Sequence, residues 1–330
     1  LTTIEIQNIY FVGNGGKCFN PTPPTITSQP TSQTLYAGPP AGFSLRASGT
    51  PPLSYQWSLN GANITGATNN LLVLVNVQLT NSGTYAVTVS NMVDSILSSN
   101  AVLTVDPPPP CDPAPAGLVS WWAGEDNAYD QIGGNNGSLV GNAGYGAGEV
   151  GAGFTFDGNG AGVQVGGSSS NLWLQNFTIE TWIKRASASV VSYGSGGNGT
   201  IFGYSPGGYY FFINGLGNLI FAQLGNASYV TGPAITDTAW HHVAITKNGA
   251  TIVFYLDGAG YATPAHNVSC TFTGGPGIGY RPDNADNSFF GTIDELSVYR
   301  RALSSAEIQG IYLAGVGGKC FSPVPPGITS

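Results

Sequence analysis

The chain has 330 residues, of which 42% are hydrophobic and only 8% are charged, and its formal net charge is −8. This length and this apolar content suit about two well-packed domains and exclude extended disorder. The nine Lys and Arg residues leave no basic surface, so nucleic acid is not an expected partner. The apolar stretches are too short to span a bilayer, so no membrane insertion is expected in this segment.

The first 28 residues recur near the other end of the chain. Residues 1–28 and 303–330 align without a gap at an offset of 302, and 18 of the 28 positions are identical. The match predicts a repeat unit of 302 residues. We therefore expect residues 1–20 to be the C-terminal helix and tail of a preceding unit. Residues 323–330 are expected to begin the next linker and the next unit.

Proline-rich stretches divide the unit into two blocks. They lie at Pro21–Pro24 (PTPP), Pro107–Pro110 (PPPP) and Pro323–Pro326 (PVPP). Each is expected to form an extended, semi-rigid spacer. The predicted first block is 21–106, the linker is 107–114 and the predicted second block is 115–322.

The first block contains short alternating segments such as GFSLRAS, LSYQWSL and GTYAVTVS, bounded by Gly, Asn or Pro. This pattern is typical of an antiparallel β-sandwich. Trp57 in SYQW and the N-x-G-x-Y motif that ends at Tyr85 resemble the core tryptophan and the tyrosine corner of the immunoglobulin superfamily. The positions where that family commonly has disulfide cysteines hold Leu45 and Val87, so both are expected to pack against the indole.

The second block has longer and more aromatic segments, among them GFTFDG, FTIETWIKR, WHHVAITKNG, TIVFYLDG and GTIDELSVYRRAL. Their order resembles the laminin G-like, concanavalin A-like jelly-roll family, which implies two packed sheets. Ser304 or Ser305 as an N-cap, followed by Ile308, Ile311 and Tyr312 at helical spacing, predicts a short closing helix. The predicted fold class is all-β, an immunoglobulin-like sandwich followed by a concanavalin A-like jelly roll.

Cysteine pairing follows from these resemblances. The termini of an immunoglobulin sandwich leave at opposite ends, whereas jelly-roll termini commonly lie side by side. The resemblance therefore implies a disulfide between Cys111 and Cys320 in an oxidising setting. The alternative is that both are unpaired structural cysteines. Cys18 is expected to pair within a preceding repeat, and Cys270 has no assignable partner.

A structural Ca²⁺ is implied by the jelly-roll resemblance, because domains of that family frequently hold one. The ion needs six to eight oxygen ligands. The candidate ligands are Asp126, Asp130, Asp157 and Asp294. The alternative is that these carboxylates cap turns of the backbone.

Aromatic residues of the second block suggest a platform for glycans. The candidate glycan contacts are Trp122, Trp173 and Tyr209. Since neighbouring residues of a strand point to opposite faces, only one member of the Trp121–Trp122 and Tyr209–Tyr210 pairs can join a platform. The alternative for all of them is core packing.

Six N-x-S/T sequons permit N-glycosylation without demonstrating it. They begin at Asn63, Asn136, Asn176, Asn198, Asn226 and Asn267.

The sequence offers no catalytic constellation. The spacing of Glu180, Asp294 and Glu295 does not place a carboxylate pair across a cleft, as glycosidic cleavage requires. His241 and His242 are adjacent on a predicted strand and point to opposite faces, so they do not form a zinc site. The chain is therefore not expected to be an enzyme.

Together these features predict a secreted or cell-surface structural protein, a stalk, sheath or filament of alternating domains. Its expected partners are other copies of the same repeat, through self-assembly or within a covalent array. The alternative is a glycan-binding adhesin, or the non-catalytic accessory region of a polysaccharide-degrading protein. A further alternative, in which separate chains donate residues 1–28 to a neighbour, is disfavoured because each jelly roll has its own tail, Leu303–Ser330.

Overall fold

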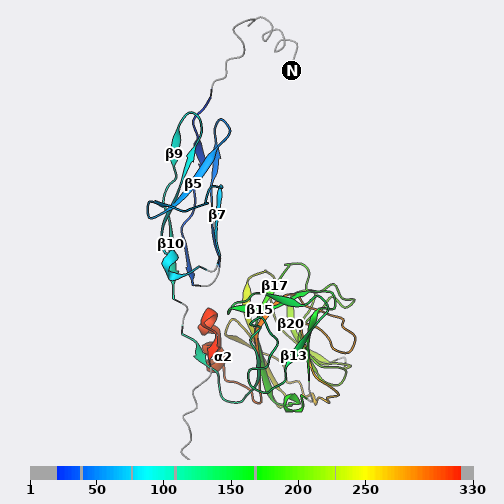
Figure 1. The fold of residues 1–330 in the computed structure, drawn as a ribbon. Coiled ribbons are helices and arrows are strands. Elements are labelled where there is room, and N and C mark those ends of the chain that lie inside the picture. Colours follow the sequence, from blue (N-terminus) through cyan, green and yellow to red (C-terminus); the bar gives the residue numbers. More distant parts are fainter. Residues whose placement is uncertain are drawn as a thin grey trace, which may run out of the picture. The chain divides into compact units, whose positions relative to one another are not determined.

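The computed structural model describes residues 21–37, 40–75, 77–107, 110–166, 169–226 and 228–320. The chain divides into two compact units, Leu1–Pro108 and Pro109–Ser330. Both are built from strands (Figure 1), so the all-β prediction is confirmed. The expectations for residues 1–20, for residues 323–330 and for Cys18 lie outside the described residues. Among the described helices, none has the length and apolar character needed to cross a membrane.

The first unit is a sandwich of short strands. Its main sheet has the order β2-β10-β8-β5-β6 with β9 beside β8, and β1-β4 and β3-β7 form two further pairs. All these pairs are antiparallel except β2 and β10, which run parallel. The strands are β1 (Thr25–Ser28), β2 (Gln33–Tyr36), β3 (Ala41–Ser44), β4 (Arg46–Ser48), β5 (Ser54–Leu59), β6 (Ala62–Asn63), β7 (Leu71–Leu74), β8 (Gly83–Ser90), β9 (Ser95–Leu97) and β10 (Ala101–Asp106).

The core of the first unit surrounds Trp57, which is completely buried. Leu45 and Val87 are buried in the same cluster, where their apolar side chains replace a disulfide. Tyr85 is also buried, and its hydroxyl donates a hydrogen bond of 2.9 Å to the backbone oxygen of Asn81. This bond ties the start of β8 to the turn before it, as in a tyrosine corner.

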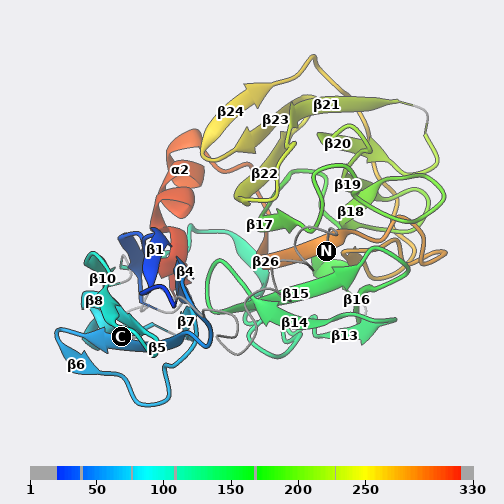
Figure 2. The same ribbon diagram turned by 90° about the horizontal axis from the view of Figure 1, so that it is seen from above.

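The second unit is a jelly roll of two large sheets (Figure 2). One sheet has the order β14-β15-β26-β17-β22-β23-β24 with β12 beside β26, and the other has the order β13-β16-β25-β18-β19-β20-β21. The strands of the first sheet are β12 (Leu118–Trp122), β14 (Gly144–Ala147), β15 (Ala152–Asp157), β17 (Phe177–Arg185), β22 (Trp240–Asn248), β23 (Thr251–Leu256), β24 (Ala259–Ala262) and β26 (Phe290–Tyr299). Those of the second are β13 (Gly137–Val140), β16 (Gly162–Val165), β18 (Gly199–Gly203), β19 (Tyr209–Ile213), β20 (Asn218–Gln223), β21 (Tyr229–Ala234) and β25 (Gly277–Ile278).

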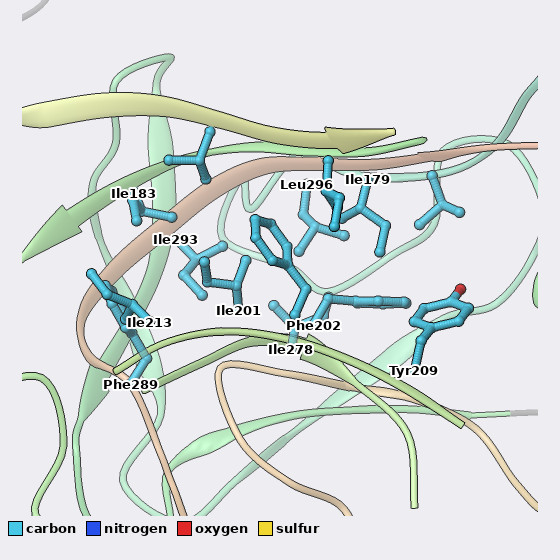
Figure 3. Packing of buried hydrophobic residues seen from close by; sticks show 14 of the residues in the cluster. Ile179, Ile183, Ile201, Phe202, Tyr209, Ile213, Ile278, Phe289, Ile293 and Leu296 are labelled. Carbon is cyan, nitrogen blue, oxygen red and sulfur yellow. The ribbon is translucent and has the colours of Figure 1, made fainter. Parts of the chain in front are cut away.

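Alternation along the strands fills the space between these two sheets. Figure 3 shows Ile179 and Ile183 of β17 facing Phe202 and Ile213 of the opposite sheet, and all four are completely buried. Since a strand turns successive side chains to opposite faces, this core face is paired with an outer face on each sheet. The outer faces carry the candidate sites.

A bulge in β26 places two acidic residues together on one outer face. Ile293 and Leu296 both point into the core, although they are three positions apart. The pairing of β26 with β17 shifts register between them, and Glu295 has a positive φ of 58°. A bulge inserts one extra residue into the alternation. Asp294 and Glu295 therefore both leave the core face.

The predicted closing helix is α2, Ser305–Ala314. The Ser304 hydroxyl accepts a hydrogen bond from the Glu307 backbone N–H, and the Glu307 carboxylate accepts one from the Ser304 N–H, so the helix begins with a capping box. Its buried residues Ile308 and Ile311 pack on the outer face of the eight-stranded sheet, against Tyr299 and its neighbours. The helix thus covers a sheet face that otherwise contacts water.

Candidate functional site

A depression on the outer face of the seven-stranded sheet is a candidate binding site. It has a volume of about 460 Å³, and β19, β20 and the start of β21 form most of it. Because Tyr209 and Phe211 point into the core, the pleat of β19 turns Tyr210 and Phe212 outward. These two rings stack with their centroids 4.3 Å apart. The floor of the pocket is therefore aromatic.

Amides surround this aromatic floor. The lining amides are Asn198, Asn214, Gln223, Asn226 and Asn287. Arg281 also lines the pocket, with its guanidinium carbon 6.0 Å from the centre of the Tyr210 ring, and it is neutralised by an ion pair of 2.6 Å with Asp283. The lining residues, which are all described, include no carboxylate. A neutral ligand with apolar faces and many hydroxyl groups matches this surface, since its faces stack on the rings and its hydroxyls bond to the amides.

Asn287 lines the pocket and has a buried side-chain acceptor. Only 5% of the residue is exposed, and its side-chain Oδ1 has no hydrogen-bond partner among the described residues. Its backbone oxygen accepts a hydrogen bond of 2.8 Å from the Thr200 hydroxyl, which lies 3.1 Å from the Tyr210 hydroxyl. A buried acceptor without a donor is costly, so this oxygen destabilises the fold locally.

The predicted glycan contacts do not coincide with this pocket. Trp122 and Tyr209 are both 0% exposed in the core, so the prediction that they contact a glycan is wrong. Only one of the two adjacent tyrosines faces outward, but it is Tyr210 and not Tyr209. Trp173 is 43% exposed and stacks on Phe272 away from the pocket, with ring centroids 6.1 Å apart.

The four carboxylates predicted as calcium ligands do not form one site. Within the described ranges, no group of three or more His, Cys, Asp or Glu side chains is arranged to hold a metal ion. Asp130 accepts hydrogen bonds from the backbone N–H groups of Ile132 and Asn135, and Asp157 accepts one from its own turn. Asp126 is exposed. Asp130 and Asp157 therefore cap turns, as the alternative expectation had it.

Asp294 differs from the other three carboxylates because it is completely buried. Its Oδ2 accepts hydrogen bonds of 2.9 Å from the N–H groups of Glu149 and Val150, whereas its buried Oδ1 has no partner in the described part of the chain. Burial raises the pKa of Asp294 well above its ordinary value, and the nearby Glu295 and Glu125 raise it further. Either a proton or a cation relieves such a group. The structural Ca²⁺ expected from the sequence therefore stays a proposal, and the raised pKa of Asp294 favours a proton on this group.

A buried ion cluster lies on the outer face of the eight-stranded sheet. The ammonium of Lys319 is 3.2 Å from a carboxylate oxygen of Glu180 and 2.9 Å from one of Glu295. The second oxygen of Glu180 is 3.1 Å from Nε2 of His242, and Trp121 Nε1 donates to Glu295 at 3.1 Å. Burial lowers the pKa of Lys319, but the two carboxylates outweigh it, so this pKa is raised. Glu180 and Glu295 are therefore committed to structural ion pairs.

The two adjacent histidines take opposite environments. While His242 is buried, His241 lies 2.8 Å from Asp257 and 3.0 Å from Asp237. The hydrogen bond to Asp257, reinforced by Asp237 and opposed by partial burial, raises the pKa of His241 to about 9. The His241 and His242 rings have different partners and point away from each other, so they are not placed to bind one metal ion together.

The raised pKa of His241 predicts how the stability of the second unit depends on pH. The pKa of His241 in the folded chain is above its unfolded value of roughly 6.5. Protonated His241 therefore contributes its full stabilisation of the fold below about pH 6.5, and this contribution is lost as the pH rises through about 9. His241→Gln should lower the thermal midpoint of the second unit at pH 6 and have a smaller effect at pH 10. Calorimetry at both values checks this, and an equal effect at both would contradict it.

Comparison with known families assigns both units. A model of the immunoglobulin domain matches residues 23–91, and a laminin G model of the concanavalin A-like lectin/glucanases superfamily matches residues 157–309. The chain carries an immunoglobulin domain and a laminin G-like domain. Both kinds of domain are typical of extracellular proteins.

Solved structures resemble parts of this chain. Domain 4 of AbnA, a GH43 extracellular arabinanase from Geobacillus stearothermophilus in complex with arabinotriose, is 18% identical over 58% of this chain and 96% of its own, with a TM-score of 0.47. A mutant of Trypanosoma rangeli sialidase displaying trans-sialidase activity is 18% identical over 60% of this chain and 33% of its own, with a TM-score of 0.47. A chimeric titin Z1Z2 is 25% identical over 27% of this chain and 99% of its own, with a TM-score of 0.25.

The laminin G-like domain is closed by a disulfide between Cys111 and Cys320, the pair expected from the sequence. The two residues are 209 positions apart, and their Cα atoms are 5.5 Å apart. Cys270 is a buried free thiol, and burial raises its pKa to about 11. It is therefore protonated and unreactive at neutral pH.

Two of the six sequons lie at the pocket of the laminin G-like domain. Asn226 is exposed and Asn198 is half-buried, and both line the pocket. The other four sequon residues are exposed: Asn63, Asn136, Asn176 and Asn267. Glycosylation of Asn226 would place a covalent glycan at the pocket, so the same surface cannot both carry that glycan and stay open.

Proposed function

We propose that this chain is part of an extracellular structural protein, a rod or filament of repeated units that each contain one immunoglobulin domain and one laminin G-like domain. The observation that carries the proposal is the position of Cys111 beside Cys320. Since the laminin G-like domain begins and ends at one place, units that repeat every 302 residues can be joined in series without the path crossing this large domain.

The immunoglobulin domains and the proline segments then set the length of the rod. A laminin G-like domain adds only the 5.5 Å between its two cysteine Cα atoms. A proline segment adds about 3.1 Å per residue. A link that is repeated with constant geometry generates a helical assembly. The low charge of the chain, 8%, suits the packing of such units against one another.

The tail of the laminin G-like domain argues for a continuous array over donation of segments between chains. Ile308 and Ile311 are buried against their own domain, and Cys320 is bonded within it. A domain that already holds this tail has no place for an equivalent segment, residues 1–28, from another chain.

The mass of the native protein tests the array. Denaturing electrophoresis under reducing conditions is expected to give a band well above 33.9 kDa, and electron micrographs are expected to show rods. Each added repeat of 302 residues adds roughly 31 kDa, scaled from 33.9 kDa for 330 residues. A single band near 34 kDa would overturn the proposal.

Glycan binding is a second candidate function, favoured by the aromatic pocket with its amide rim. The ligand class is a neutral polysaccharide, because Arg281 is already paired with Asp283 and the lining residues include no carboxylate. Without a carboxylate among its lining residues, the pocket also lacks the acid and the base that glycoside hydrolysis uses. This candidate therefore assigns binding without cleavage.

A pair of tyrosine variants tests the pocket. Tyr229 lines it and is 61% exposed, whereas Tyr261 is 44% exposed on β24 of the other sheet. Tyr229→Ala should weaken binding of a neutral oligosaccharide selected on a glycan array about tenfold, roughly 1.4 kcal/mol, since a stacking face is lost. Tyr261→Ala should leave it unchanged. Equal effects of the two variants in titration calorimetry, or no saturable binding by the parent chain, would reject the pocket.

A further inference from the structure

The laminin G-like domain starts and finishes on one short parallel ladder. Strand β11 (Asp112–Pro113) pairs with β27 (Lys319–Cys320), Asp112 opposite Lys319 and Pro113 opposite Cys320. The Asp112 N–H donates to the Gly318 oxygen at 2.9 Å, and the Ala114 N–H donates to the Cys320 oxygen at 3.1 Å. The disulfide of Cys111 lies at the start of β11 and at the end of β27.

Because β11 and β27 are parallel, a pull on the two ends of the domain loads their ladder in shear. The chain arrives along β11 and departs along β27 in the same direction. A pull on the segment before Cys111, against a pull on the segment after Cys320, slides one strand along the other. The force is then carried by the disulfide, which is the shortest covalent path between the two segments. All residues from 112 to 319 lie on a closed loop beside that path.

We propose that the Cys111–Cys320 disulfide carries tension past the laminin G-like domain, which therefore stays folded when the chain is stretched. The immunoglobulin domain has no such bypass, because residues 21–106 contain no cysteine. Load must pass through its strands from β1 to β10. The chain thus combines an extensible domain in the load path with a shielded domain beside it.

This division has a consequence for the pocket. A pocket built from β19, β20 and β21 exists only while the sheet is folded. A domain outside the load path keeps such a surface intact at forces that unfold the domain in series with it. The inference requires only that chain precedes Cys111 and follows Cys320, so it does not rest on the array.

Single-molecule stretching of the full chain tests the bypass. Handles are attached at the two ends, and Cys18→Ser is included to prevent unwanted pairing. The oxidised chain should show one unfolding step of about 250 Å, from the residues between Thr25 and Asp106. Reduction of the folded chain, or Cys111→Ser with Cys320→Ser, should add a step of about 700 Å from the 209-residue loop. Cys270→Ala, the matched control, should not add it.

Two results of the stretching experiment overturn the proposal. The first is the long step in the oxidised chain, and the second is its absence from a reduced chain that circular dichroism shows to be folded. Reduction of the folded parent chain keeps the test valid where the double variant does not fold. A thiol assay in denaturant without reductant should find one free thiol in the Cys18→Ser chain, that of Cys270. Three free thiols would show that the bypass bond is not formed and would also overturn the proposal.

Discussion

Replacing both Cys111 and Cys320 by serine is expected to lower the free energy of unfolding of the laminin G-like domain by about 5 kcal/mol. The disulfide closes a loop of 209 residues, and on the chain-entropy relation such a loop restricts the unfolded state by about this amount. Typical domains have a total stability of about 5–15 kcal/mol. The variant should therefore unfold at a much lower urea concentration, which hydrogen–deuterium exchange mass spectrometry over a urea series measures for each domain separately.

The immunoglobulin domain provides the internal control for this experiment. Its described residues contain no cysteine, and Leu45 and Val87 stand where a disulfide is common in the family. Its unfolding midpoint should be the same in the parent chain, in the double variant and in the presence of a reductant. An unchanged midpoint for the laminin G-like domain, or an equal shift of both domains, would contradict the assignment of the stabilisation to this bond.

The features that the sequence predicted well are those with short-range or strongly periodic signals. Tyr85 follows an N-x-G turn at fixed spacing, and its hydroxyl reaches Asn81, only four residues back. Ser304 and Glu307 form their capping box within one turn of helix. Each of these depends on neighbours along the chain, so the residues themselves carry the information.

The pocket was missed because its parts are distant in sequence and depend on strand parity. Tyr209 and Tyr210 are chemically identical in the sequence, and only the pairing of β19 with its neighbours decides which ring faces the core. Asn198 and Asn287 are 89 positions apart and meet only through the fold. A one-residue change of parity exchanges the two faces of a strand. An alternation pattern predicts that one tyrosine is exposed but not which one.

The ion cluster was missed for a related reason. Lys319 lies in a Gly-Gly-Lys-Cys segment that has the composition of a linker, and a lysine in such a segment is ordinarily exposed. The disulfide at Cys320 and the pairing of β27 with β11 instead hold it against the sheet. Its partners Glu180 and Glu295 come from strands more than a hundred residues apart. The bulge at Glu295 turns that carboxylate to the same face, and no simple alternation predicts it.

Lys319→Met is expected to destabilise the laminin G-like domain by about 3–5 kcal/mol, the usual cost of removing one partner from a buried ion pair. Without the ammonium, Glu180 and Glu295 are two buried carboxylates that repel each other, although His242 still lies beside Glu180. Urea unfolding at pH 7 measures the loss. The matched control is Lys184→Met on β17, because Lys184 is exposed, and its effect should stay within about 0.5 kcal/mol.

The pH dependence separates lost charge pairing from lost packing. In the parent chain, burial opposes ionisation of Glu180, but Lys319 and His242 outweigh it and lower its pKa. Its stabilisation is therefore present above the unfolded value of about 4.3 and is lost as pH falls through the folded value. In Lys319→Met the buried carboxylates lose their cation, so their pKa values rise and acidification relieves the repulsion. The deficit of the variant should shrink between pH 7 and pH 5, and adding Glu180→Gln should recover part of it at pH 7. A deficit that is constant with pH would mean that Lys319 acts through packing of its aliphatic chain and not through its charge.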